Sequence, residues 1–147
     1  MQAWTRLVRA YAATTRRLTA ELQAEYGLGL NAYEALLRLS REEGDRMKRV
    51  DLARGLLLTP SGVTRLLDGL QEAGFVEPAS CATDRRITYA QLTDAGRAKL
   101  KAASKAHVAS IRELFEDTLS QAELEQLATL LDRLPDVAGD SGACGVD

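Results

Sequence analysis

The sequence predicts a mainly α-helical fold with one small β-hairpin, and three observations support this prediction. Apolar residues recur at helical spacing in several separate segments. The stretch "LLTPSG" at residues 57–62 joins two short helical patterns through a tight turn. Two short runs typical of strands, "FVEPA" and "RITYAQL", then follow around a polar loop. Two helices joined by a tight turn and followed at once by a hairpin form a winged helix-turn-helix.

Two helices are expected before this motif. The apolar stripe of the first consists of Trp4, Leu7, Val8, Tyr11, Leu18 and Leu22. Gly27 and Gly29 suit a helix stop and a turn. Asn31 is expected to cap the second helix, with Glu34 completing a capping box.

The helix-turn-helix itself is expected between residues 50 and 74. Val50, Leu52, Ala53 and Leu56 form its short first helix. Thr59 is the expected N-cap of the second helix, and Pro60 stands at its first position, where a missing N–H costs nothing. The residues expected to be buried are Val63, Leu66, Leu67 and Leu70, and Gly74 suits a left-handed cap.

The remainder of the chain is expected to be a hairpin and two further helices. Pro78 belongs on an edge strand because it cannot donate a ladder hydrogen bond. Thr93 is expected to cap a long helix, and Ser120 with Glu123 forms a capping box for the last one. Residues 137–147 are small and polar, so we expect a disordered tail.

Charge is distributed unevenly along the chain. The net charge is −2, but residues 46–101 hold ten basic and six acidic side chains, a local charge of +4. Local field, not total charge, decides what a surface attracts. No apolar stretch is long enough to span a bilayer, and the two cysteines do not suggest a disulfide framework, so a soluble cytoplasmic protein is expected.

The start of the second helix of the motif has the residue types that DNA recognition requires. Small or hydrogen-bonding groups there let the backbone approach phosphate and let side chains reach base edges. An arginine at this place can bond to guanine through two hydrogen bonds. The candidate DNA-binding residues on this helix are Thr59, Ser61, Gly62, Thr64 and Arg65.

The polar loop of the hairpin supplies a second candidate contact. A hairpin beside a recognition helix lies over the neighbouring minor groove, which draws in arginine where it is narrow. Arg85 and Arg86 suit that task. Asp84 cannot contact phosphate favourably, so we expect it to hold a guanidinium in one geometry.

These motifs resemble the MarR family of bacterial winged-helix transcription regulators. The similarity runs over roughly residues 47–101, through "TPSGVTRLLDGL" and "DRR…LTDAGR". It implies a single domain over residues 1–136, with a winged helix at 31–93 whose wing is 75–92. It also implies a homodimer through helices at 1–30 and 94–136, with each protomer placing its winged helix on one half-site of a palindromic operator.

The resemblance also implies a repressor released by a small aromatic or anionic effector. Such an effector would bind between the dimerisation and DNA-binding parts. The candidate contacts on or near inward stripes are Trp4, Tyr11, Tyr33 and His107, and Arg16 or Arg17 is expected to meet a carboxylate of the effector. For His107 a packed interface histidine is the favoured alternative to a ligand contact or a pH sensor.

Other functions are less well supported by the residues. One histidine and two distant cysteines cannot form a four-ligand soft metal site, although carboxylates leave a harder metal open. Cys81 and Cys144 are interpreted as spectators, with a thiol-responsive wing as the alternative for Cys81. No nucleophile–base pair, phosphate loop or carboxylate dyad indicates an enzyme, and no cofactor is expected. An interaction protein that keeps the winged helix for protein contacts is a third class.

Overall fold

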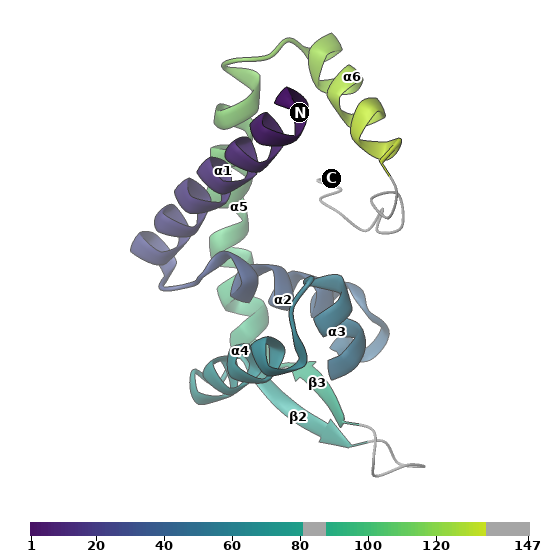
Figure 1. Ribbon diagram of the computed structural model, residues 1–147. Coiled ribbons are helices and arrows are strands. Elements are labelled where there is room, and N and C mark those ends of the chain that lie inside the picture. Colours follow the sequence, from purple (N-terminus) through teal and green to yellow (C-terminus); the bar gives the residue numbers. More distant parts are fainter. Residues whose placement is uncertain (81–87, 135–147) are drawn as a thin grey trace. The chain divides into compact units, whose positions relative to one another are not determined.

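The computed structural model describes residues 1–80 and 88–134 (Figure 1). These residues belong to two compact units, Met1–Val108 and Ala109–Asp147. The helices are α1 (Gln2–Tyr26), α2 (Leu30–Arg41), a short 3₁₀ turn η1 (Glu43–Asp45), α3 (Arg49–Gly55), α4 (Pro60–Glu72), α5 (Asp94–Glu116) and α6 (Gln121–Asp132). The strands are β1 (Arg46–Lys48), β2 (Val76–Ser80) and β3 (Thr88–Leu92). The predicted mainly helical fold is confirmed.

The boundary between α1 and α2 depends on glycine and on burial. Gly27 ends α1 in the left-handed conformation, with φ 63°, as predicted. Asn31 is not the cap of α2, and that prediction is wrong: the N-cap is Gly29, and the helix begins at Leu30. Leu28 is buried and Leu30 packs against the core, so tertiary packing starts the helix earlier than the local capping pattern indicates.

The helix-turn-helix forms where it was predicted. The Thr59 hydroxyl accepts a hydrogen bond of 3.1 Å from the Gly62 N–H, and Pro60 begins α4. Two residues beyond the end of α4, Gly74 has a φ of 74°. The N–H of Phe75 donates to the carbonyl of Leu70 at 2.9 Å, which closes the last turn.

The sheet has one strand more than the predicted hairpin. β2 and β3 pair antiparallel from Val76 opposite Leu92 to Ser80 opposite Thr88. β1 pairs with the other side of β3, which gives the order β1-β3-β2. β2 is therefore an edge strand, and Pro78 stands where proline is tolerated.

One apolar core joins the elements of the first unit. It takes side chains from α1, α2, α3, α4, the sheet and the first part of α5. The largest fully buried side chains are Leu36, Leu39, Leu52 and Leu67. Each such leucine contributes roughly 1.5–3 kcal/mol by leaving water. This core packs the helix-turn-helix against the sheet and so fixes the position of α4.

The second unit contains the end of α5 and all of α6. Ser120 and Glu123 form the predicted capping box, because each side chain bonds to the other residue's backbone N–H. No residue of α6 is buried. Within residues 1–80 and 88–134, no helix has both the length and the apolar character needed to cross a membrane.

Candidate nucleic-acid interface

The first turn of α4 presents polar groups around an open hollow. Pro60, Ser61, Thr64 and Arg65 line this hollow, and all four are exposed. The opposite side of the same helix is anchored by the buried residues Val63, Leu67 and Leu70. The helical period therefore separates a packed face from a face that a large partner can reach.

Hydrogen bonds fix the geometry of this turn. The Thr64 hydroxyl donates to the Pro60 carbonyl at 2.9 Å, so its oxygen can still accept a bond from a partner. Thr59 and Ser61 share a bond of 3.2 Å between their hydroxyls. The Gly62 N–H is already used by Thr59 and Pro60 has none, so Ser61 supplies the remaining N–H of these three positions.

Gly62 contributes close packing rather than a free donor. A Cβ at Gly62 would lie 3.1 Å from the Thr59 hydroxyl and 3.6 Å from Cβ of Leu58. Gly62 was predicted as a DNA contact, but it lies against the N-cap residue Thr59. Glycine is favoured there because the turn before α4 leaves little room for a Cβ.

The wing brings its two strand ends together. Ser80 and Thr88 face each other as the last described pair of the two strands. The predicted contacts Asp84, Arg85 and Arg86 belong to residues 81–87, outside the described residues, as does Cys81. Cys144 also lies outside them.

Several exposed basic residues near the helix-turn-helix were not predicted as DNA contacts from the sequence. Arg46 and Lys48 are exposed on β1, and the Arg46 guanidinium lies 5.4 Å from the centre of the Tyr89 ring. Arg54 is exposed on α3 and pairs with Asp51 at 3.3 Å. The basic character of residues 46–101 is the signal that could have identified them.

The five predicted effector contacts occupy different places in the first unit. The rings of Tyr33 and His107 are in contact, with centroids 4.4 Å apart, and the Tyr33 hydroxyl bonds to Ser104 at 3.2 Å. Burial lowers the pKa of His107, and the Glu21 carboxylate opposes that shift. Arg17 bonds to Glu21 at 2.8 Å, which places it in the neighbourhood of the same cluster.

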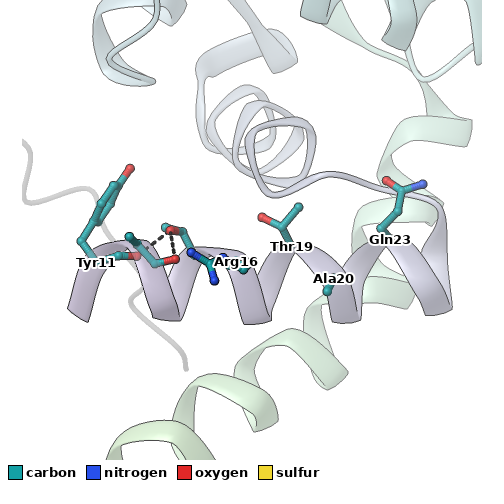
Figure 2. A pocket seen from close by; sticks show the side chains of 7 residues that line it. Tyr11, Arg16, Thr19, Ala20 and Gln23 are labelled. Carbon is teal, nitrogen blue, oxygen red and sulfur yellow. Dashed lines mark hydrogen bonds between the residues drawn. The ribbon is translucent and has the colours of Figure 1, made fainter. Parts of the chain in front are cut away.

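Trp4 and Tyr11 are exposed, contrary to the expectation of an inward position. Their exposed fractions are 66% and 69%, because the core covers only the C-terminal half of α1. Tyr11 lines an open hollow along α1 together with Arg16, Thr19, Ala20 and Gln23 (Figure 2). The described residues hold no group of three or more histidine, cysteine or acidic side chains placed to bind a metal.

Comparisons with known proteins agree with this architecture. The sequence model of the MarR family matches residues 26–87. The transcriptional regulator MhqR of Bacillus subtilis is 30% identical over 129 residues, which cover 87% of this chain and 86% of MhqR. MhqR is described as an HTH-type regulator.

Solved structures extend the match to nearly the whole fold. AbsC, a MarR family regulator of Streptomyces coelicolor, is 34% identical with a TM-score of 0.81, over 88% of this chain and 86% of AbsC. A second regulator of that family and organism, solved in complex with DNA, is 25% identical with a TM-score of 0.83, over 88% of this chain and 81% of its own. The chain belongs to the MarR family of winged-helix DNA-binding transcriptional regulators, a family of regulators and not of enzymes.

Proposed function

We propose that this regulator binds a palindromic operator as a homodimer and represses transcription until a small effector releases it. The observation that carries the proposal is the first turn of α4. There Ser61, Thr64 and Arg65 are exposed around a hollow while the other side of the helix is buried. The similar Streptomyces coelicolor regulator was solved in complex with DNA, which supports DNA binding by this fold.

In this proposal α4 enters the major groove. Arg65 would bond to a guanine edge, while Ser61 and Thr64 would contact bases or phosphates. Arg86 of the wing would enter the minor groove, oriented by Asp84 and accompanied by Arg85. Exposed basic side chains outside α4, such as those of Lys48 and Arg54, would contact phosphate.

The homodimer is supported by an uncovered apolar stripe on α1. Trp4, Leu7, Val8 and Tyr11 follow one another at helical spacing, and all are exposed. Exposed contiguous apolar surface of this kind indicates an interaction site. The dimerisation helices would be those at residues 1–30 and 94–136.

A small aromatic or anionic effector is the proposed signal. An effector would have to pack against the rings of Tyr33 and His107, which are in contact and buried, and Arg17, which pairs with Glu21, supplies a nearby cation. Trp4 and Tyr11 would contribute from the uncovered part of α1. Tyr33 and the buried side of α4 belong to one core, so an effector that contacts Tyr33 would bias the position of α4.

The proposal is tested by mobility shift of the purified protein on the DNA upstream of its own gene, over a salt series. We expect a specific complex, with a footprint of two half-sites about one helical turn apart, whose affinity falls steeply with salt. Arg65→Ala should weaken the specific complex by roughly 5- to 150-fold, as for loss of a bidentate base contact. Arg86→Ala should weaken it while leaving the oligomeric state unchanged.

The control for both variants is Arg41→Ala, which removes an exposed arginine from the last turn of α2, outside α4, the wing and the proposed dimerisation helices. It should bind like the wild type. Unchanged affinity in the Arg65 and Arg86 variants would contradict the assigned contacts. Equal affinity for operator and random DNA would contradict sequence-specific regulation from this site.

A further inference from the structure

The first turn of α5 is attached directly to the end of the recognition helix. The Thr93 hydroxyl donates to the Gly74 carbonyl at 2.7 Å and accepts from the Gly96 N–H at 3.0 Å. The backbone N–H of Thr93 donates to the Phe75 carbonyl at 3.1 Å. One threonine therefore ties the residues that follow α4 to the beginning of α5.

Gly96 permits backbone to lie against backbone at the same place. A Cβ there would overlap the Phe75 carbonyl oxygen and lie 2.8 Å from Cδ1 of Leu92. The carbonyl belongs to the main chain, so no side-chain rotation could relieve the overlap. Any larger residue at this position must move α5 away from the end of α4.

The segment between the end of α4 and Phe75 is short and is held by a backbone hydrogen bond. Phe75 is three residues beyond Glu72, the last residue of α4, and its N–H bonds back to Leu70. The DNA-facing turn lies at the other end of α4, about 18 Å away along a helix of this length. A tilt of about 5° at the attachment would thus displace that turn by about 1.5 Å.

A second attachment comes from the same part of α5. Arg97 forms an ion pair with Asp45, which stands just before β1 and α3. Asp45 raises the pKa of Arg97 through a hydrogen bond and its charge. The first turn of α5 thus holds the chain both ahead of the helix-turn-helix and behind it.

We propose that Thr93 and Gly96, supported by the Arg97–Asp45 ion pair, form a positioning joint that sets the half-site spacing the dimer accepts. This inference rests on the proposed dimeric operator binding. The two recognition helices of a dimer must match both half-sites at once, so a fixed angle between α4 and α5 selects one spacing. A loosened joint would accept several spacings and bind the correct one less tightly.

Thr93→Val tests the joint with little change of shape, because it removes the hydroxyl and its two bonds. Thr93→Ser is the matched control, because it keeps the hydroxyl. Each protein is titrated with the native operator and with operators whose half-sites are moved by one and two base pairs in either direction. Urea unfolding of each protein reports folding separately.

We expect Thr93→Val to lose about fivefold or more in affinity for the native spacing. It should lose less on the shifted operators, so that spacing discrimination is reduced. Thr93→Ser should keep the wild-type profile. Arg97→Gln removes the ion pair with Asp45 and should likewise reduce the difference in affinity between the native and the shifted operators. This variant replaces Thr93→Val in the test if Thr93→Val is too unstable to fold.

The proposed joint would be contradicted if Thr93→Val and Arg97→Gln lost the same affinity at every spacing, or lost none. Either result would leave the proposal of operator binding intact. If the wild type itself does not discriminate between spacings, dimeric half-site recognition is overturned and the joint with it. The wild-type titration therefore separates the two failures.

Discussion

Two helical glycines illustrate how surroundings decide what a residue does. Gly69 lies within α4, and a Cβ added there would meet nothing within 4 Å. Gly96 lies in the first turn of α5 against the Phe75 carbonyl. Helix propensity disfavours glycine within a helix, as at Gly69, whereas Gly96 is required by a close approach.

Alanine substitutions at these glycines should therefore have opposite effects. Gly69→Ala should raise the free energy of unfolding by about 0.5–1 kcal/mol, because alanine is the better helix former. Gly96→Ala should lower it by about 1–3 kcal/mol, because the new methyl group forces α5 and Phe75 apart. Urea unfolding of both variants checks this, and a stabilised Gly96→Ala protein would contradict the close approach.

His107 should make the stability of the fold depend on pH. It is the only histidine in the chain, is 6% exposed, and has its pKa lowered by burial. The unfolded chain takes up this proton at about pH 6.5, whereas the folded chain does so only at lower pH. Protonation thus favours the unfolded chain, and the free energy of unfolding should fall as pH drops from about 6.5 towards the folded-state pKa.

A comparison with His107→Gln isolates this effect, because glutamine does not titrate. Over pH 7.5 to 5.5 the wild type should lose stability relative to the variant, by at most about 1.4 kcal/mol per pH unit for one proton. Urea unfolding at each pH is the measurement. Parallel pH profiles would show that the buried ring is not the titrating group.

At the scale of elements, α1 is one helix with two environments. Leu18 and Leu22 are buried in the C-terminal half, while Trp4, Leu7, Val8 and Tyr11 are exposed in the N-terminal half. The apolar stripe is continuous along α1, and exposed apolar surface of this kind indicates that another surface covers it. The proposed partner is the same region of a second chain.

Val8→Asp should weaken the dimer, because a carboxylate would have to be buried in an apolar interface. We expect the dimer dissociation constant to rise at least about tenfold, equivalent to 1.4 kcal/mol, with operator affinity falling in parallel. Analytical ultracentrifugation over a concentration series measures it. Ala13→Asp adds the same charge to an exposed residue on the opposite side of α1 and should leave the dimer intact. A dimer unaffected by Val8→Asp would exclude this stripe from the interface.

For the whole molecule, charge distribution matters more than its total. A net charge of −2 would repel DNA if it were spread evenly, yet residues 46–101 carry +4. These residues contain the helix-turn-helix and the wing. At physiological salt the field reaches only about 8 Å, so the local excess decides the interaction.

Much of the fold could be predicted because its signals are local. The Thr59 cap with Pro60, the left-handed Gly27, and the Ser120–Glu123 box each depend on a few neighbouring residues. The helical spacing of apolar residues likewise indicated which side of α4 is buried and which carries Ser61, Thr64 and Arg65. The sequence by itself therefore determined the order of helices, the helix-turn-helix and the exposed polar face of α4.

Tertiary structure decided the features that depend on residues far apart in the chain. β1 is a three-residue strand with two exposed basic residues, and only its pairing with β3 makes it a strand. The start of α2 follows the burial of Leu28 and not the capping pattern at Asn31. The attachment of Thr93 and Gly96 to Gly74 and Phe75 likewise depends on a backbone approach that no local pattern encodes. Local propensities act over one or two turns, whereas strand pairing and close packing depend on how the whole core is assembled.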